Sequence, residues 1–480
     1  MYKLLSSLGI LLFLMLACNQ QNNYSATHSI EKGKPNVLII LTDQWRAQAT
    51  GYAGDPNINT PHLDSLAAIS VNFKNAVSGM PVCSPFRASL MTGQRPLTHG
   101  VFMNDVQLDT SAITLGKIFK NAGYETGFIG KWHLDGHGRL SYIPPGNRRQ
   151  GFDFWKANEC THNYNHSVYY QNQDSKPKIW DGYDAVSQTD AAIDFIKNNK
   201  TKNSSFSLVL SYGTPHAPYQ TAPDKYQKRI NMDSIQLRKN VPEDMKAQVR
   251  KDLAGYYAHI VALDDMIGKL ISSLKKSGQI QNTIVVFTSD HGDLLGSQGA
   301  YKKQQPYDES IRVPMLFYIP EQLKISPGEK KAAMNSEDIL PTLLGLCKIK
   351  IPKTVEGINY STYLEGNEEF NRAALITCVQ PFGQWNRVAH NGREYRGLRT
   401  EKYTYTRDLN GPWLLFDNEK DPYQLNNLVG NVQMSELQNT LENQLSRRLK
   451  ENNDEFLPGM EYIKKWAYPT DSTGTVPYSE

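Results

Sequence analysis

The segment NVLIILTDQ, residues 36–44, is a continuous apolar run that ends in an acidic and an amide side chain. A short, unbroken apolar run is typical of a strand that is buried on both faces of a parallel sheet. Further runs of this kind follow along the chain: Thr126–Ile129, Phe206–Leu210, Thr283–Phe287 and Val313–Ile319. The sequence therefore predicts a buried sheet whose first strand ends just before Asp43 and Gln44.

Helix candidates separate these runs. They are Pro61–Ala68, Ile113–Asn121, Met245–Ser277 and Glu337–Leu346. Strands that alternate with helices are typical of α/β proteins with a mostly parallel sheet flanked by helices. We expect this larger domain to span residues 35–364.

Residues 365–480 show a different pattern. Short strand candidates joined by tight turns are Ala373–Val379, Tyr395–Thr400, Lys402–Thr406 and Trp413–Asp417, and a helix candidate, Gln433–Glu451, follows them. Strands in direct succession favour antiparallel pairing. The sequence thus predicts a smaller C-terminal α+β subdomain with an antiparallel sheet and a helix.

Polar side chains cluster where the predicted strands of the larger domain end. Asp43 and Gln44 follow the first strand, Lys131 and His133 the second, His216 the third, and Asp290 with His291 the fourth. In open parallel sheets, ligands bind beyond the carboxyl ends of the strands. We therefore expect these side chains to meet at one edge of the sheet.

The N-terminus has the pattern of an export signal. Lys3 precedes the apolar run Leu8–Leu16, which is too short to span a bilayer, and Ala17-Cys18 follows. We expect residues 1–18 to be a signal peptide of the lipoprotein type with Cys18 acylated, and the polar residues 19–34 to be a tether. A signal peptide cleaved nearby without lipidation is the alternative. We therefore expect an exported protein of the bacterial periplasm or cell surface that contacts the membrane only through a lipid anchor.

The amino-acid composition excludes few classes of protein. The chain has 480 residues, 39% of them hydrophobic and 21% charged, with a net charge of +4. These fractions are those of an ordinary soluble globule, and so small a charge, without a nucleic-acid-binding motif, does not indicate a nucleic-acid partner. If Cys18 and Cys83 are modified, the odd set Cys160, Cys347 and Cys378 remains, and we expect no disulfide.

The pentapeptide CSPFR, residues 83–87, is the most specific local pattern in the chain. Pro85 suits the first turn of a helix, because its missing N–H would be unpaired there anyway. Cys83 would then stand at a helix N-terminus, where the partial positive charge favours an anion or a developing alkoxide. Arg87, one turn further on, adds a fixed cation.

In this order, the segments NVLIILTDQW, CSPFRASLMTG, YETGFIGKWHL, SYGTPHAPY, TIVVFTSDHGD and KKQQPYDESIRVP, with the C-terminal stretch from Arg396 to Leu428, resemble the type I sulfatases of the alkaline phosphatase superfamily. The resemblance covers residues 35–428 and implies an alkaline-phosphatase-like fold. It also implies that a formylglycine-generating or sulfatase-maturing enzyme oxidises Cys83 to Cα-formylglycine (3-oxoalanine).

The resemblance implies a metal site as well. Asp43, Gln44, Asp290 and His291 would hold one divalent cation, with the formylglycine oxygen at residue 83 as a further ligand. Oxygen ligands suit Ca²⁺, the usual ion of the family, or Mg²⁺. Many relatives have Asp at the position of Gln44 and Asn at that of His291. Imidazole is a softer ligand, so a transition metal is an alternative.

The resemblance further implies roles in catalysis. The hydrated aldehyde at residue 83, beside the metal and Arg87, would attack sulfur, and its second hydroxyl would then release sulfate. Lys131 and Lys303 would contact sulfate oxygens; Lys303 fits the family spacing better than the adjacent Lys302. His216 would be the general acid, a role that Lys303 could share, and His133 the base.

Polar residues near the Lys131 motif are candidates for binding the rest of the substrate: His99, Asn104, Asp135, His137 and His162. The leading expectation is a sulfatase that removes O-sulfate from a sulfated polysaccharide or oligosaccharide. Alternatives within the superfamily are a phosphonate monoesterase or phosphodiesterase and a choline or aryl sulfatase. An alternative of another class is a non-catalytic binder of sulfated glycan in which Cys83 stays unmodified.

Overall fold

The computed structural model describes residues 34–478 except 203, 367–369, 371 and 388–390. The predicted signal peptide, Cys18 and nearly all of the predicted tether lie outside the described residues. From Pro35 on, the described residues form one compact unit, and the predicted boundary between residues 364 and 365 stays a prediction. No helix in the described part of the chain combines the length and the apolar character needed to cross a bilayer.

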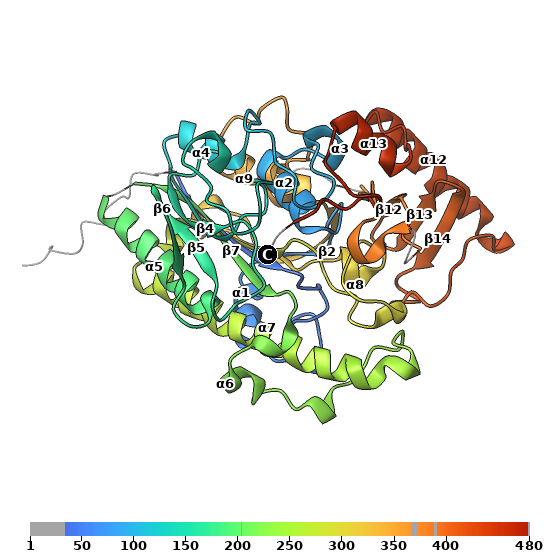
Figure 1. Cartoon of the computed structure of the whole chain (residues 1–480), viewed down its shortest axis with the longest axis horizontal. Helices are drawn as coiled ribbons and strands as arrows, with labels where there is room; N and C mark the ends of the chain where they lie inside the picture. Colours follow the sequence, from blue (N-terminus) through green and yellow to red (C-terminus); the bar gives the residue numbers. More distant parts are fainter. Residues whose placement is uncertain (1–33, 203, 367–369, 371, 388–390, 479–480) are drawn as a thin grey trace, which may run out of the picture. The chain divides into compact units, whose positions relative to one another are not determined.

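A ten-stranded sheet organises this unit (Figure 1). Its strands, in spatial order, are β10 (Gly328–Met334), β2 (Val71–Ala76), β9 (Met315–Tyr318), β8 (Thr283–Ser289), β1 (Asn36–Asp43), β7 (Phe206–Pro215), β3 (Glu125–Lys131), β4 (Phe154–Asn158), β5 (Val168–Gln171) and β6 (Asp174–Ile179). The strands from β8 to β4 run parallel. The pairs β8–β9, β2–β9, β4–β5 and β5–β6 are antiparallel.

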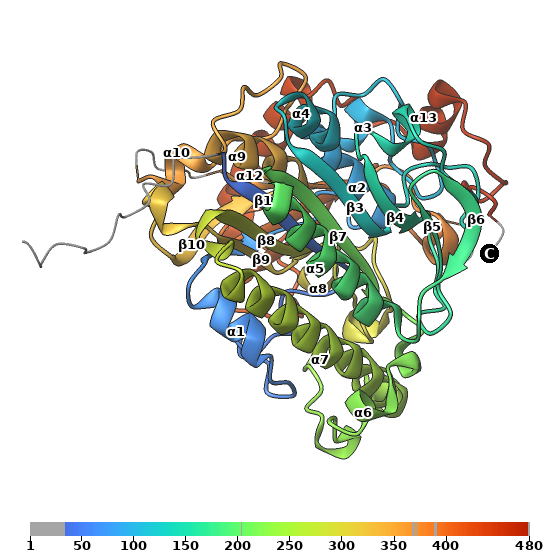
Figure 2. The same cartoon turned by 90° about the vertical axis from the view of Figure 1, so that its left-hand side faces the viewer.

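Both faces of the sheet are covered. In β1, Val37, Ile39 and Leu41 contribute to one hydrophobic cluster, whereas Leu38 and Ile40 contribute to another. Because side chains alternate between the two faces of a strand, this division places a core on each side. Helices α5 and α7 lie side by side over one face (Figure 2), while α2, α4 and α9 belong to the other core. The predicted α/β class with a mostly parallel sheet is confirmed.

The α-helices have these bounds: α1 (Pro61–Ala67), α2 (Cys83–Thr92), α3 (Pro96–His99), α4 (Leu115–Asn121), α5 (Asp184–Lys202), α6 (Asp224–Gln227), α7 (Lys246–Lys276), α8 (Asp308–Ile311), α9 (Ile339–Leu346), α10 (Ser361–Leu364), α12 (Ser435–Glu451) and α13 (Gly459–Trp466). Short 3₁₀ helices span Asn147–Arg149, Tyr219–Thr221, Met232–Ser234, Glu243–Met245, Ile280–Asn282, Ser297–Gly299, Glu321–Leu323, Ser336–Asp338, Gly383–Trp385 and Val432–Met434.

The C-terminal region forms the predicted antiparallel sheet. Its order is β11 (Ala374–Cys378), β12 (Tyr395–Arg399), β13 (Tyr403–Asp408) and β14 (Gly411–Asp417), and α12 packs against it through Leu441, Leu445 and Leu449. Hydrogen bonds join β11 to loops beside the larger sheet, from the Thr377 N–H to the Gly79 carbonyl (2.7 Å), from Thr377 Oγ1 to the same carbonyl (3.2 Å), and from Asn335 Nδ2 to the Leu375 carbonyl (2.8 Å).

Candidate active site

The carboxyl ends of β1, β3, β7 and β8 meet the first turn of α2. This helix begins at Cys83, is buried along its whole length, and ends at Gly93 in a left-handed conformation (φ 66°). The Ser84 N–H in its first turn donates to Asn104 Oδ1 (3.0 Å). Cys83 therefore lies at a helix N-terminus, as its sequence context predicts.

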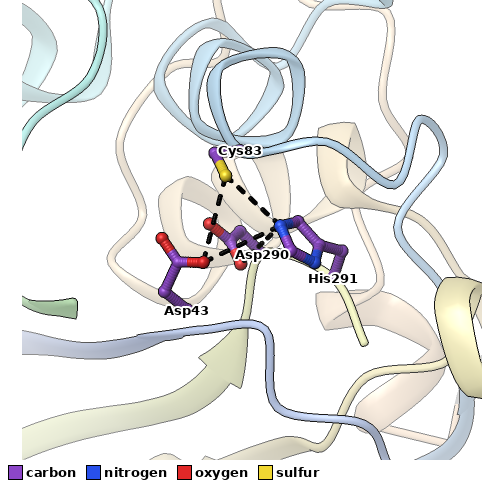
Figure 3. A group of neighbouring side chains, drawn as sticks. All are labelled: Asp43, Cys83, Asp290 and His291. Carbon is purple, nitrogen blue, oxygen red and sulfur yellow. Dashed lines mark hydrogen bonds and ion pairs between the residues drawn. The ribbon is translucent and has the colours of Figure 1, made fainter. Parts of the chain in front are cut away.

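Asp43, Cys83, Asp290 and His291 point toward one another (Figure 3). Their candidate ligand atoms all lie within 4.8 Å of one another. Cys83 Sγ lies 3.3 Å from His291 Nε2 and 3.9 Å from Asp43 Oδ1, and His291 Nε2 lies 3.6 Å from Asp290 Oδ1. These residues and Arg87 are each at most 2% exposed, and we call the five of them the floor of the site.

Arg87 holds the outer oxygens of both floor carboxylates. Its Nη2 lies 3.3 Å from Asp43 Oδ2 and 3.0 Å from Asp290 Oδ2. Lys131 Nζ also binds Asp43 Oδ2, at 2.6 Å. Each carboxylate thus gives its Oδ2 to a fixed cation and turns its Oδ1 toward Cys83 and His291. Arg87 is itself fixed, because Nη1 donates to the Lys131 carbonyl and to Ser211 Oγ, both at 2.7 Å.

The floor is strongly polarised. Burial opposes ionisation of Asp43, but the neighbouring cations Lys131 and Arg87 hold its pKa well below the ordinary value. Burial and the neighbouring Asp43 raise the pKa of Asp290 instead. Two buried carboxylates this close repel each other, so a further cation between their Oδ1 atoms would stabilise the ionised pair.

His291 presents one defined nitrogen to this centre. Its Nδ1 lies 2.8 Å from the Gly292 carbonyl, and a carbonyl can only accept, so Nδ1 carries the proton. The lone pair of Nε2 then faces Cys83 and the carboxylates. A hydrogen bond of this kind fixes the tautomer of metal-binding histidines.

Gln44 lies beside the floor in a left-handed backbone conformation (φ 69°), which is uncommon for a residue other than glycine. Its Nε2 donates to Asp293 Oδ2 (2.6 Å), and Tyr219 OH donates to the same oxygen (2.5 Å). Its Oε1 accepts from Lys303 Nζ (3.1 Å). Asp293 thus orients the Gln44 amide, a role that the sequence pattern does not indicate.

Lys303 and His216 form a pair above Cys83. Lys303 Nζ lies 3.1 Å from His216 Nε2 and 3.6 Å from Cys83 Sγ. His216 Nδ1 donates to the Ala217 carbonyl (2.8 Å), which leaves Nε2 to accept from Lys303. Burial and the Lys303 ammonium lower the pKa of His216 well below its ordinary value, so the shared proton belongs to Lys303.

His133 also has a left-handed backbone (φ 56°). Its Nε2 lies 3.1 Å from Asp105 Oδ1, and Asp105 in turn accepts from Arg139 Nε (3.0 Å) and Nη2 (2.9 Å). Burial opposes protonation, but Cys160 and Asp105 raise the pKa of His133 to about 10. At neutral pH His133 is therefore a cation and a hydrogen-bond donor, and Asp105 is a positioning residue that its loop sequence does not reveal.

A cavity of about 320 Å³ opens over Cys83. Lys131, His133, His216 and Lys303 line it together with Asn104 and His162, two of the predicted substrate-binding residues. The His162 ring stacks on His216 with centroids 4.7 Å apart. We call the outer boundary of the cavity the side wall; it consists of Arg139, His162, Lys302, Gln384, Thr475, Val476 and Tyr478.

The other predicted substrate-binding residues do not line this cavity. His99 is buried, with Nε2 3.0 Å from Ser89 Oγ and Nδ1 accepting from the Val101 N–H (3.1 Å). Asp135 is paired with Arg148, and the half-exposed His137 donates from Nδ1 to the Asp135 carbonyl (2.6 Å). These three side chains make structural contacts away from the cavity, so the structure does not bring them to the site, and their predicted role in substrate binding stays a prediction.

Comparison with known proteins gives a consistent result. The sulfatase family model matches residues 35–349, and a model described as the N-sulphoglucosamine sulphohydrolase C-terminal region matches residues 296–451. An ulvan-active sulfatase of Formosa agariphila is 44% identical over 462 residues, which cover 96% of this chain and 89% of that protein. An endo-4-O-sulfatase of Bacteroides thetaiotaomicron is 30% identical over 455 residues, which cover 82% of this chain and 88% of that protein.

Among solved structures, the yidJ protein of Bacteroides fragilis superimposes with a TM-score of 0.79 at 31% identity, covering 90% of this chain and 98% of its own. The family model spans well over half of the chain, and these relatives match this chain over most of its length. The chain therefore belongs to the sulfatase family of the alkaline phosphatase superfamily and is a sulfuric ester hydrolase.

Proposed function

We propose that the protein is an exported sulfatase that removes O-sulfate from a sulfated polysaccharide or oligosaccharide, using a formylglycine at residue 83 and a divalent cation. The observation that carries this proposal is the floor. Two carboxylate oxygens and an imidazole nitrogen face the side chain of residue 83 at the N-terminus of α2, and Arg87 fixes both carboxylates from behind.

The floor residues fit a divalent cation. The inward Oδ1 atoms of Asp43 and Asp290 and the nearby Gln44 amide suit a hard ion, and Ca²⁺ is our first choice. The same oxygen ligands suit Mg²⁺, and the Nε2 of His291 also suits a transition metal. A cation bound there supplies a Lewis acid that polarises oxygens at residue 83 and on the sulfate.

In the structure, the Cys83 sulfur stands in for the oxygens of hydrated formylglycine. That group supplies one hydroxyl to attack sulfur and a second hydroxyl through which the enzyme is regenerated. The residues around it prepare this step. The helix N-terminus and Arg87 favour negative charge at residue 83, and the ammonium groups of Lys131 and Lys303 lie where they can stabilise the sulfate oxygens.

Lys303 and His216 are our candidates for protonating the leaving alcohol. Their shared proton lies between Lys303 Nζ and His216 Nε2, and both residues line the cavity. His133, held as a cation by Asp105, donates a hydrogen bond to developing negative charge, and it can act as the predicted base only after passing its own proton on.

A sulfated glycan is the proposed substrate because the similar proteins include an ulvan-active sulfatase and an endo-4-O-sulfatase. The cavity supports this assignment, because histidines, lysines, amides and an arginine line it. Sugar hydroxyls and sulfates both need such partners.

The experiment compares sulfate and phosphate esters of one leaving group, followed by a panel of defined sulfated sugars, with protein expressed alongside a maturing enzyme. We expect sulfate release to exceed phosphate release and to occur from at least one sugar sulfate. Faster hydrolysis of the phosphate or phosphonate ester would instead assign the chain to that branch of the superfamily. Binding of sulfated glycan without any hydrolysis would assign it to the non-catalytic alternative.

Export through residues 1–18 and lipidation at Cys18 belong to the same proposal, which rests on the sequence pattern alone. Fractionation of expressing bacteria tests it. The full chain should sediment with membranes, and Cys18→Ser should release it to the soluble fraction. Recovery of the unchanged chain in the cytoplasm would contradict export.

A further inference from the structure

The cations that surround Cys83 are nearly all paired within the described residues. Lys131 binds Asp43, and Arg139 binds Asp105. Lys303 donates to Gln44 and His216. On the proposed function, Lys131 and Lys303 contact the sulfate that is cleaved, whereas Arg139 holds Asp105. Lys302 is different, because no described residue forms an ion pair or hydrogen bond with its side chain, although it lines the same cavity.

Lys302 reaches the cavity through a backbone conformation that is unfavourable for lysine. Its φ of 65° is in the left-handed region, which costs a lysine free energy. The Lys302 N–H donates to Asp293 Oδ1 (2.8 Å), and its carbonyl accepts from the Leu294 N–H (2.8 Å). Adjacent side chains of an extended segment point to opposite sides, yet Lys302 and Lys303 line one cavity here.

The carboxylate of Asp293 lies near Lys302, but it cannot pair with the Lys302 ammonium without losing hydrogen bonds that it already accepts. Asp293 Oδ1 accepts from the N–H groups of Leu295 and Lys302, and its Oδ2 accepts from Gln44 and Tyr219. Lys302 is half-buried, and burial together with Lys303 lowers its pKa. An unpaired cation in a partly desolvated wall is an unfavourable arrangement unless a ligand completes it.

A second donor of the side wall is also unpaired. Nε2 of Gln384 is shielded from solvent and has no hydrogen-bond partner among the described residues. Lys302 and Gln384 come from segments about eighty residues apart in the chain, so the two observations are independent. Both groups are donors, and both therefore require an acceptor.

We infer that Lys302, with Gln384 on the same side wall, forms a subsite for a second anionic substituent of the sugar, separate from the sulfate that is cleaved. This inference rests on the proposed function and names its substrate class: sugars that carry a carboxylate or an additional sulfate beside the scissile ester. A charge-assisted hydrogen bond from an ammonium suits either group.

The test uses Lys302→Met, which keeps the length of the side chain and removes the charge. Three monosaccharides that share one scaffold and one scissile sulfate are compared. The first has no other charged group, the second also has a carboxylate, and the third has a second sulfate. We expect the wild type to prefer one of the two anionic substrates, and the variant to lose about tenfold or more of kcat/KM on that substrate relative to the uncharged one. The preferred substrate identifies the group as carboxylate or sulfate. Lys302→Arg should restore part of the preference.

Lys324→Met is the matched control. Lys324 also has a left-handed backbone (φ 56°), but it is exposed and does not line the cavity. It should leave all three substrates unaffected. An equal loss on all three substrates in Lys302→Met would overturn the subsite, as would a wild type that shows no preference for either anion.

Binding of the desulfated products separates this inference from the proposed function. The carboxylated or still sulfated product should bind wild-type protein more tightly than the uncharged product, and Lys302→Met should remove most of that difference. This readout needs no turnover. A protein that shows this binding preference and releases no sulfate would refute the proposed activity alone, whereas sulfate release without the preference would refute the subsite alone.

Discussion

The floor and the side wall of the cavity are built in opposite ways. The floor residues follow strands of the central sheet or begin α2, are at most 2% exposed, and pair every charge with another. The side wall comes from loops and from the end of the chain, where Tyr478 is 50% exposed and stacks on Arg139, and it contains the unpaired Lys302. On the proposed function, we therefore expect the floor to carry the reaction and the wall to carry selectivity.

The largest effect should come from the floor. Cys83→Ala removes the precursor of the proposed nucleophile, so sulfate release should fall by about 10⁴-fold or more while folding persists. Cys347→Ala is the control, because it removes another buried thiol that does not line the cavity. Substantial turnover by Cys83→Ala would remove residue 83 from the mechanism.

Asp290→Asn should lower the affinity for the metal without lowering the stability of the metal-free protein. The amide keeps an oxygen for Arg87 but removes one of two repelling carboxylates, so the metal-free variant should melt no earlier than the metal-free wild type. Metal affinity should drop by roughly 10- to 100-fold or more. Ca²⁺ at about 100 times its Kd should stabilise the wild type by about 2.7 kcal/mol. Equal calcium-induced shifts in melting temperature would exclude Asp290 as a ligand.

His216→Asn tests the partner of the proposed proton donor, because Nε2 of His216 accepts from Lys303 Nζ and helps to position its proton. Loss of general acid catalysis costs about 10²- to 10⁴-fold when the leaving group is a sugar alcohol. An acidic nitrophenol leaves without a proton, so nitrophenyl sulfate should lose far less. Equal losses on both substrates would show that His216 acts in another way.

Asp105→Asn should have the smallest effect, and it concerns pH. Asp105 helps to raise the pKa of His133 to about 10; without that carboxylate the pKa falls, and His133 loses its proton at lower pH. If cationic His133 is the active form, the alkaline limb of the kcat/KM profile moves to lower pH. Asp109→Asn, at an exposed turn, should leave the profile in place. An unchanged profile for Asp105→Asn would contradict this assignment.

The central strands and most of the longer helices could be predicted from the sequence because they carry unbroken apolar runs or helical spacing. Strands β2, β6 and β10 could not, since VNFKNA, DSKPKI and GEKKAAM are polar segments that packing and pairing stabilise; β6 and β10 are the edge strands, and β2 lies next to β10. Helix α5 was missed because its apolar residues are diluted by Asn, Lys and Thr. The run Val313–Ile319 was predicted correctly as a strand, but its antiparallel direction depends on tertiary context.

The floor was predictable for a related reason, because its residues follow strands directly. The side wall was not. Tyr478 and Thr475 reach the cavity through the fold of the C-terminal region, and the Asp105–Arg139 pair joins two loops without a local pattern. His99 resembles a cleft residue in sequence, yet packing directs it to Ser89.

The central claim, that an aldehyde at residue 83 performs the reaction, is tested most directly by the mass of the tryptic peptide Asn75–Arg87. Preparations with different degrees of maturation should be measured for both this mass and the rate of sulfate release. The account predicts that the rate rises in proportion to the fraction of peptide with the aldehyde in place of the thiol. Full activity from a preparation whose peptide contains only unmodified cysteine would contradict it.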